Sequence, residues 1–291
     1  MQSYSLYDDD EELSSLMSRS LRRAAKHGGK KQKTGRLRDW ETEEVPATGA
    51  DSRAEEAAFE AFSLDRIITG PGPILKQGKE ASVFRCEDAN GAPVAVKVYK
   101  DIEQRSFQAM AAYLQGRFAE AGINRRDAMH ILSTPSALQA FWVHAEYTVL
   151  KRLHRAGVPV PRPFAECSTG IAMEFVHTEG CPHEAAPRLK EFHADNAGAT
   201  RIKERILAAI EGMLELDIVH GDLSPYNILV RSGEPVIIDF PQAVDARFNA
   251  GARDLLKRDL LNICRYAPNP KESPQEEASR LCERLWHSRN G

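Results

Sequence analysis

The stretch HGDLSPYNILV occupies residues 220–230, and VIIDF follows at residues 236–240. Each stretch contains an apolar run typical of a short β-strand, and the RSGE segment between them is typical of a tight turn. Asp222 and Asn227 precede the first strand, whereas Asp239 ends the second. An antiparallel strand pair would bring Asn227 and Asp239 side by side, with Asp222 facing the same space. We expect the three side chains to form one site.

Their chemistry indicates phosphoryl transfer. Carboxylate and amide oxygens bind hard cations such as Mg²⁺, so Asn227 and Asp239 are the predicted metal ligands. Asp222 is placed to accept a proton from an incoming hydroxyl group. An Asp, four residues, an Asn and a later strand-end Asp are the spacing of protein-kinase-type enzymes. The alternative is an Asp-rich loop whose side chains only cap turns, but three residues at the required spacing favour the site.

A lysine and a glutamate upstream are predicted to form an ion pair. VAVKVY at residues 94–99 places Lys97 in an otherwise apolar strand. A helix is predicted over residues 141–156, and Glu146 lies on its inward apolar stripe. A buried charge is costly unless it is paired, so each residue is the expected partner of the other, and the pair would hold Lys97 against nucleotide phosphates. The alternative has Lys97 reaching solvent and Glu146 at the helix margin. The apolar members of the stripe are Val143, Leu150 and Leu153.

The stretch KQGKEASVF, residues 76–84, is the candidate phosphate-covering loop. It has one glycine, Gly78, where the kinase loop G-x-G-x-x-G has three. Lys79 and Ser82 are expected to supply donors instead, through an ammonium group, a hydroxyl group and nearby backbone N–H groups. By itself, a Gly-Lys pair between strands is also typical of an ordinary turn.

The composition is that of a soluble globular protein. The 291 residues are 42% hydrophobic and 28% charged, with a formal net charge of −3, so we expect no stable DNA binding. The five cysteines are scattered without a CxxC pair, which argues against a disulfide framework or a zinc site and favours the reducing cytoplasm. The acidic N-terminal sequence is unlike a signal peptide, and no apolar run is long enough to span a membrane.

Residues 1–50 are predicted to be a mobile charged tail, because blocks of charge cannot bury enough apolar surface to offset chain entropy. Residues 8–12 are DDDEE, and residues 21–38 carry eight Lys or Arg and no acid. The basic block is read as a solvated tail or as a weak contact with RNA or another polyanion. Further predictions are a helix over 53–63 and a polar insert over 101–140 that is helical in places, with breaks at Gly116, Gly122 and Pro135. The rest of the chain is predicted to contain a linker over 178–200, helices over 201–216 and 252–266, and an irregular end over 267–291.

The motifs, taken together and in order, resemble the RIO family of atypical protein kinases, most closely its type-one branch. They are GKEASVF, VAVKVYK, EYTVLKRLHRAGVPVPRP, MEFV, HGDLSPYNILV, IIDFPQAV and RDLLNICRY, and they span roughly residues 70–266. The resemblance implies an α+β, two-lobed protein-kinase-like fold. Its N-lobe, residues 51–177, would be a small antiparallel β-sheet with one key helix. Its C-lobe, residues 178–291, would be reduced and mainly helical.

The resemblance also implies an activity: transfer of the γ-phosphoryl group of ATP to serine or threonine hydroxyls of proteins, including itself, or to water. The implied cofactors are ATP and Mg²⁺, with Mn²⁺ as a substitute. By carry-over, the catalytic residues are Asp222, Lys97 and Glu146, and the metal ligands are Asn227 and Asp239. The phosphate loop contains Gly78, Lys79, Glu80 and Ser82. The gatekeeper is Met173, and the adenine contacts are backbone atoms of Glu174 and Val176.

The sequence departs from the usual kinase pattern, since HGD replaces HRD, DFP replaces DFG, and no APE follows. Two other functions stay open. One is a small-molecule phosphotransferase of the aminoglycoside- or choline-kinase type, although few residues remain for its helical substrate lobe. The other is an ATP-gated ribosome-assembly factor with little kinase activity. No motif identifies the protein substrate, and the candidate self-phosphorylation sites are serines 14, 15, 18, 20 and 63.

Overall fold

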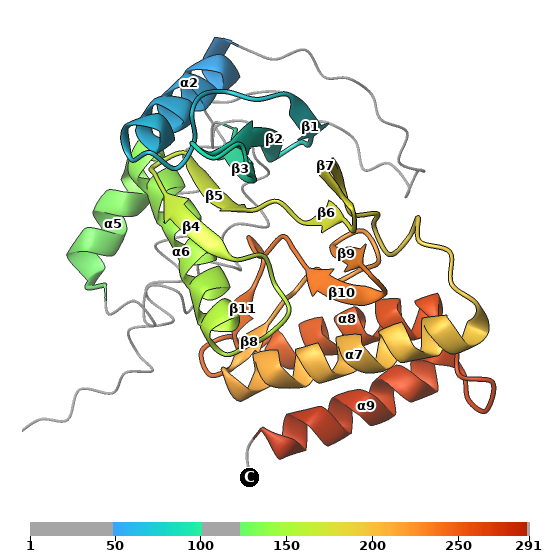
Figure 1. Ribbon diagram of the computed structural model, residues 1–291. Coiled ribbons are helices and arrows are strands. Elements are labelled where there is room, and N and C mark those ends of the chain that lie inside the picture. Colours follow the sequence, from blue (N-terminus) through green and yellow to red (C-terminus); the bar gives the residue numbers. More distant parts are fainter. Residues whose placement is uncertain (1–48, 101–122, 290–291) are drawn as a thin grey trace, which may run out of the picture.

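The computed structural model describes residues 49–100 and 123–289, which form a sheet-containing lobe and a mainly helical lobe (Figure 1). The first lobe is built on a five-stranded antiparallel sheet with the strand order β1-β2-β3-β5-β4. The predicted α+β two-lobed architecture is therefore confirmed. The strands are β1 (Ile74–Gln77), β2 (Ala81–Glu87), β3 (Pro93–Tyr99), β4 (Pro163–Glu166) and β5 (Gly170–Glu174).

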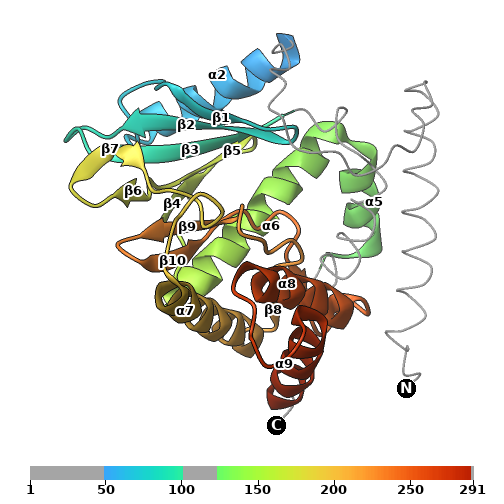
Figure 2. The same ribbon diagram turned by 90° about the vertical axis from the view of Figure 1, so that its right-hand side faces the viewer.

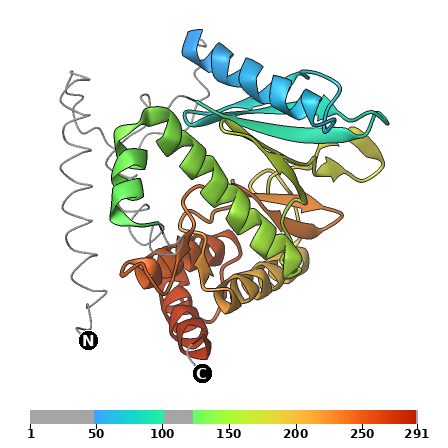
Figure 3. The ribbon, with the colours of Figure 1, turned by 90° about the vertical axis from the view of Figure 1, so that its left-hand side faces the viewer.

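Helix α2 (Gly49–Leu64) covers one face of this sheet (Figures 1 and 3). Its Ala- and Glu-rich sequence favours a helix, and Phe62 is fully buried against the sheet. The register pairs Val83 of β2 with Lys97 of β3, so these two side chains share a face. Phe84 lies on the opposite face and packs with Phe62 in one apolar cluster. The face with Lys97 is left for the cleft between the lobes.

Helices α5 (Arg125–Ser133) and α6 (Pro135–Arg155) precede β4. The predicted break at Pro135 is confirmed, because α5 ends at Ser133 and Pro135 starts α6. The first turn of a helix needs no proline N–H, and Thr134 stands at the N-cap. The predicted inward stripe is confirmed, with Glu146, only 3% exposed, among buried apolar residues. Residues 101–122 of the predicted insert, and the tail including block 21–38, lie outside the described residues.

The second lobe is built on three helices beside short two-stranded sheets (Figure 2). The prediction of a linker over 178–200 was wrong, because a hairpin and the first turn of α7 lie there. The irregular end predicted over 267–291 was also wrong, since a helix with a capping box at Ser273 forms there. The elements are β6 (His177–Thr178), β7 (Cys181–Ala185), α7 (Asn196–Glu215), β8 (Ile218–Val219), β9 (Ile228–Arg231), β10 (Glu234–Ile237), β11 (Val244–Asp245), α8 (Ala252–Tyr266) and α9 (Pro274–Ser288).

In the described part of the chain, no helix combines the length and the hydropathy that crossing a bilayer requires.

Candidate active site

The β9–β10 hairpin places two of the predicted site residues. Ile228 pairs with Ile237, and the Ile238 N–H donates to the Asn227 carbonyl oxygen at 3.0 Å. Asn227 therefore precedes one strand where Asp239 follows the other, as the sequence predicted. Asp239 has a φ of +73°, a left-handed conformation that Asp tolerates better than most residues. This conformation turns the chain sharply after β10.

The loop before β9 orients Asn227 toward Asp222. The Asn227 Nδ2 group donates to the Asp222 carbonyl oxygen at 2.9 Å and lies 3.4 Å from the Asp222 Oδ2 atom. Because the amide nitrogen is engaged in this way, the Asn227 Oδ1 atom is directed away from Asp222 and remains an acceptor for another group. Burial raises the pKa of Asp222; Arg258 opposes this rise and the Asp239 carboxylate adds to it. A raised pKa makes Asp222 a stronger base than an ordinary carboxylate.

Asp259 of α8 braces this loop from below. Its two carboxylate oxygens accept the backbone N–H groups of Gly221 at 2.8 Å and Leu223 at 2.9 Å, on either side of Asp222. Asn262, one turn later, donates to the Leu223 carbonyl oxygen at 2.9 Å. Burial raises the pKa of Asp259 to about 7, although both N–H groups act to lower it. Three bonds from one helix hold the backbone that carries Asp222.

His220 braces the same loop from the other side. The Asp222 N–H donates to its Nδ1 atom at 3.3 Å, so Nδ1 is an acceptor and Nε2 carries the proton given to the Ile238 carbonyl oxygen at 3.1 Å. Burial lowers the pKa of His220 to about 4, which keeps the ring neutral. A neutral, internally bonded ring indicates a supporting role.

Lys97 joins the two lobes. Its Nζ atom donates to Glu146 Oε1 at 2.8 Å and to Asp239 Oδ1 at 2.5 Å. The predicted Lys97–Glu146 pair is thus present, and the bond to Asp239 adds a second partner across the cleft. The Phe240 N–H also donates to Glu146 Oε1 at 3.3 Å, and the Tyr99 hydroxyl donates to Oε2. Glu146 therefore ties together β3, α6 and the turn after β10.

The electrostatics keep these groups charged. Burial by itself lowers the pKa of the Lys97 ammonium group, but the carboxylates of Asp239 and Glu146 outweigh burial and raise that pKa well above its usual value. Burial by itself raises the pKa of Asp239, but the Lys97 ammonium group lowers it more, so the pKa of Asp239 is below its usual value. Burial and Glu146 raise the pKa of Tyr99, so its hydroxyl stays protonated as a donor. Lys97 and Asp239 are thus both ionised at neutral pH.

The candidate phosphate loop lies between β1 and β2, above this cluster. The Gly78 N–H donates to the Ala81 carbonyl oxygen at 2.9 Å, and the Lys100 N–H donates to the Glu80 carbonyl oxygen at 2.9 Å. These bonds fix the turn that carries Lys79, which is exposed. The turn is therefore anchored at both ends on the sheet, next to the strand that carries Lys97.

Ser82 does not face the cleft. It pairs with Val98, one residue away from the Val83–Lys97 pair, so its side chain lies on the opposite face of the sheet. Its hydroxyl is buried and has no hydrogen-bond partner among the described residues. The prediction of Ser82 as a side-chain donor to phosphate was wrong, because strand alternation turns it toward the face covered by α2.

The candidate adenine strand ends at the hinge. Met173 of β5 pairs with Ala95 of β3. The Val176 carbonyl oxygen accepts from the Ala186 N–H at 2.9 Å. Among the described residues, the Val176 N–H donates to no acceptor, so it is the group left for an adenine edge. The Glu174 carboxylate binds Arg231 of β9 at 2.5 Å, which fixes the hinge to the second lobe.

The residues present fit a magnesium–nucleotide group. Asn227 Oδ1 and Asp239 Oδ2 are hard oxygen donors on neighbouring positions, and Lys97 stands beside them to meet phosphate. Within the described ranges, no group of three His, Cys, Asp or Glu residues forms a metal site made of protein ligands alone. A Mg²⁺ ion held by few protein ligands and by substrate phosphates agrees with this donor set.

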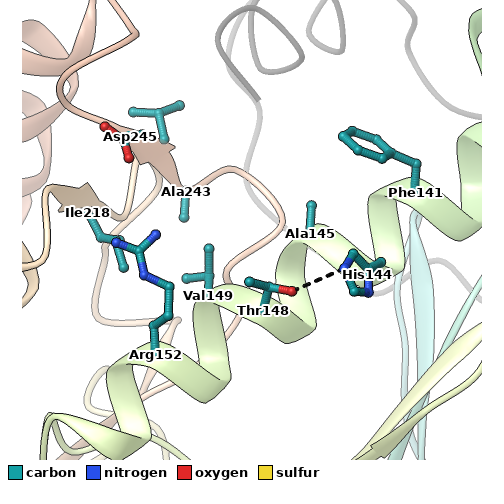
Figure 4. A pocket seen from close by; sticks show the side chains of 10 residues that line it. Phe141, His144, Ala145, Thr148, Val149, Arg152, Ile218, Ala243 and Asp245 are labelled. Carbon is teal, nitrogen blue, oxygen red and sulfur yellow. Dashed lines mark hydrogen bonds between the residues drawn. The ribbon is translucent and has the colours of Figure 1, made fainter. Parts of the chain in front are cut away.

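A separate pocket of about 260 Å³ lies between α6 and the β8–β11 ribbon, and Figure 4 shows its lining. Thr148 and His144 of α6 approach within 3.5 Å of each other on its wall. None of the predicted site residues lines it, so it is distinct from the candidate active site.

Sequence reasoning missed two supporting residues. Tyr99 was detectable because it lies two residues after Lys97 and therefore on the same face of β3. Asp259 was detectable by the argument used for Glu146, since it lies on the buried stripe of α8 between Leu256 and Leu260. A charged side chain among apolar ones at helical spacing is the signal that both carboxylates share.

Comparison with known proteins decides the family, because the RIO domain model matches residues 82–277, more than half of the chain. This chain belongs to the RIO domain family. The predicted type-one resemblance agrees with its relatives, which include the RIO-type serine/threonine-protein kinase Rio1 of Haloferax volcanii, 32% identical over 233 residues. That match covers 79% of this chain and 74% of the relative. Rio1 of Methanocaldococcus jannaschii is 36% identical over 66% of this chain and 61% of its own length.

A solved structure shares the fold of this RIO domain. The Rio2 kinase–ADP/Mg²⁺–phosphoaspartate complex from Chaetomium thermophilum aligns with a TM-score of 0.53 and 17% identity, over 82% of this chain and 76% of that chain. The human serine/threonine-protein kinase RIO1 is 29% identical, but this chain spans only 33% of its length. The matched residues of this chain include parts of both lobes and contain Lys97, Glu146, Asp222, Asn227 and Asp239.

Proposed function

We propose that this chain is a magnesium- and ATP-dependent serine/threonine-protein kinase of the RIO type. The observation that carries the proposal is the bridge formed by Lys97, which holds Glu146 in one lobe and Asp239 in the other. Kinase-type phosphoryl transfer needs this lysine, its glutamate and a metal-binding aspartate in place together. The names of the Rio1 relatives, serine/threonine-protein kinase, support the same function.

Each residue has a role in that reaction. Lys97 binds the nucleotide phosphates, and Asn227 and Asp239 would hold Mg²⁺, which would supply positive charge to offset that of the phosphates. Asp222 accepts the proton of the attacking serine or threonine hydroxyl, and its raised pKa suits this task. The backbone of Glu174 and Val176 binds the adenine edge, and Met173 is the gatekeeper.

ATP hydrolysis with little transfer to protein is a second candidate function. The solved Rio2 kinase is a complex with ADP, Mg²⁺ and phosphoaspartate, so in that protein a carboxylate bears phosphate. A small-molecule phosphotransferase is disfavoured, because the described residues after Asp239 contain only the short strand β11 and the helices α8 and α9, and these helices pack on each other and on α7. Within residues 123–289, they do not form a separate helical substrate lobe.

Replacing Asp222 with Asn tests the proposal. The variant removes the base but keeps the shape of the side chain, so we expect Mg-ATP binding within about twofold of wild type and phosphoryl transfer reduced by about 10²–10⁴-fold. The assay uses labelled ATP, Mg²⁺ and the full chain, with binding measured by calorimetry. Hydroxylamine-resistant label on serine or threonine supports the kinase, and hydroxylamine-sensitive label or free phosphate supports the ATPase. Undiminished transfer by the Asp222→Asn variant would contradict the role of Asp222.

The cytoplasm is the proposed location, since the five cysteines are all unpaired thiols. Contact with RNA or the ribosome through residues 21–38 is proposed from the charge of that block alone.

A further inference from the structure

Three cationic side chains without a role in the proposed reaction lie at the mouth of the cleft. They are Lys76 on β1 and Arg188 and Lys190 in the segment after β7. They come from both lobes, and Arg188 lies close enough to Lys76 to lower its pKa.

Arg188 and Lys190 are carried by a segment that runs along the catalytic loop. Arg188 forms a β-bridge with Leu229, the Leu189 N–H donates to the Ile228 carbonyl oxygen at 2.8 Å, and the Lys190 N–H donates to the Pro225 carbonyl oxygen at 3.1 Å. Leu189 is fully buried. The segment turns after Arg188, since the Glu191 and Phe192 N–H groups both donate to the Arg188 carbonyl oxygen at 2.9 Å; Arg188 is half-buried and Lys190 is exposed. The backbone thus places two cations beside the loop.

Lys190 is held on an exposed aromatic side chain of the catalytic loop. Its Nζ atom lies 4.4 Å from the centre of the Tyr226 ring and donates to the Tyr226 hydroxyl. Tyr226 follows Asp222 by four residues and immediately precedes Asn227. The lysine and the ring together form a platform next to the position where a phosphoacceptor hydroxyl must meet Asp222.

Lys76 approaches this platform from the other lobe. It pairs with Val83, which in turn pairs with Lys97, so its side chain lies on the face of the sheet that borders the cleft. Burial lowers the pKa of Lys76, and Arg188 and Lys97 lower it further, whereas Asp239 and Glu191 oppose them. The Glu191 carboxylate accepts the Arg188 backbone N–H at 3.4 Å. Cations that face each other in this way are stabilised by an anion between them.

We propose that Lys76, Arg188 and Lys190 form a docking surface for the acidic sequence of a phosphoacceptor segment, and that its occupant is residues 8–15 of this chain, DDDEELSS. The inference rests on the proposed kinase function. The segment offers five consecutive acids, and Ser14 and Ser15 follow the last acid by two and three residues. The 34 residues from Ser15 to Gly49 can span at most about 120 Å, so the site is within reach.

The transfer is a single displacement. The hydroxyl oxygen of Ser14 or Ser15 forms a bond to the γ-phosphorus of ATP while the bond from that phosphorus to the β,γ-bridging oxygen breaks. ADP leaves with the electron pair of the broken bond, and Asp222 accepts the hydroxyl proton. The acids bound at the docking surface hold the serine beside Asp222 but take no part in the chemistry.

Binding of a fluorescent peptide tests the docking surface without requiring catalysis. The probe is the peptide of residues 6–20, compared with the same peptide carrying Asn or Gln at positions 8–12. We expect the acidic peptide to bind about tenfold more tightly than the neutral one and to lose this advantage in the Lys190→Glu variant, since like charges repel. Lys257→Glu, on an exposed face of α8, is the matched control and should bind both peptides as wild type does.

A charge-swapped pair guards against misfolding of the variant. A peptide with Lys at positions 8–12 should bind the Arg188→Glu/Lys190→Glu variant more tightly than it binds the wild-type chain, which a misfolded variant would not show. Equal binding of the acidic and neutral peptides by the wild-type chain, or equal weakening by Lys257→Glu and Lys190→Glu, would overturn the docking surface.

Phosphate mapping separates the two proposals. Incubated with Mg²⁺ and ATP, the full chain should carry phosphate on Ser14 or Ser15, and neutralising residues 8–12 should slow that labelling about tenfold. Phosphate only on other residues overturns the docking proposal but leaves the kinase. Peptide binding with neither protein label nor ATP turnover overturns the kinase but leaves the acidic docking surface.

Discussion

Two titrating side chains, Asp259 and His220, support the loop that carries Asp222 and respond to pH in opposite directions. Asp259 has a pKa of about 7 in the folded chain, above its ordinary 3.8, so the folded state binds the extra proton between these values. The contribution of Asp259 to the free energy of unfolding is therefore largest at low pH and is lost as pH rises toward 7. His220 has a pKa of about 4, below 6.5, so the unfolded state binds the extra proton, and this term stabilises the fold as pH rises from 4 to 6.5.

The contributions of Asp259 and His220 to the free energy of unfolding should offset each other in the wild-type chain between about pH 4.5 and 6.5. In the Asp259→Asn variant, only the His220 term remains, and we expect the free energy of unfolding to rise with pH across this window. In the His220→Gln variant, it should fall. Urea denaturation at several pH values measures both slopes, and slopes of the same sign in the two variants would contradict the assignment.

At the scale of elements, a tight backbone turn connects β8 to the catalytic loop. Gly221 has a φ of +77°, and a Cβ atom there would lie 2.5 Å from the Gln242 carbonyl oxygen. Gly233, in the β9–β10 turn, has a φ of +79°, but a Cβ atom there would meet nothing within 4 Å. The two glycines share their backbone conformation and differ in the space around them.

Alanine substitution at each glycine separates these causes. Gly233→Ala should lower the free energy of unfolding by about 1 kcal/mol, the cost of a left-handed non-glycine residue. Gly221→Ala should cost clearly more, because a backbone oxygen cannot move away easily, and should also reduce phosphoryl transfer by displacing Asp222. Urea denaturation of both variants provides the comparison, and equal costs would show that the Gln242 contact is unimportant.

At the scale of the whole molecule, a buried ion pair connects the last helix to the second lobe. Lys203 of α7 donates to Glu277 of α9 at 2.7 Å and to the Ala267 carbonyl oxygen at 2.8 Å. Both side chains are less than a tenth exposed. The pair is flanked by the apolar core that α9 shares with α7 and α8.

Breaking this pair from one side should leave a buried charge without its partner. Lys203→Met and Glu277→Leu are each expected to lower the free energy of unfolding by about 3–5 kcal/mol, whereas the double variant should cost much less than their sum. A double-mutant cycle by urea denaturation measures the difference. Additive losses would indicate that the two residues act independently.

The features of the fold and the site that were predictable from the sequence are those set by interactions between residues close together in the chain or by the need to pair a buried charge. The spacing of Asp222, Asn227 and Asp239 around two strand patterns placed them together, because a hairpin is a local structure. The lone charges of Lys97 and Glu146 predicted their pairing, since burial forces a partner. The helix over residues 252–266 was predicted with its observed bounds. The helix over 135–155 was predicted to start too late, and the helix over 274–288 was missed. Both helices begin with a proline, which suits a first helical turn but was read as a break.

The sequence by itself determined the grouping of the site residues, because that depends on local periodicity and on the high cost of an unpaired buried charge. The family and the two-lobed fold were implied by the resemblance of its ordered motifs to the RIO family. Only the tertiary structure decided that Ser82 faces α2, that Lys97 bridges the lobes through Asp239, that Asp259 and His220 brace the loop, and that Lys76 lies across from Arg188. The physical reason is that these contacts join residues far apart in the chain. Strand register and lobe packing set them, and neither is visible in spacing along one sequence.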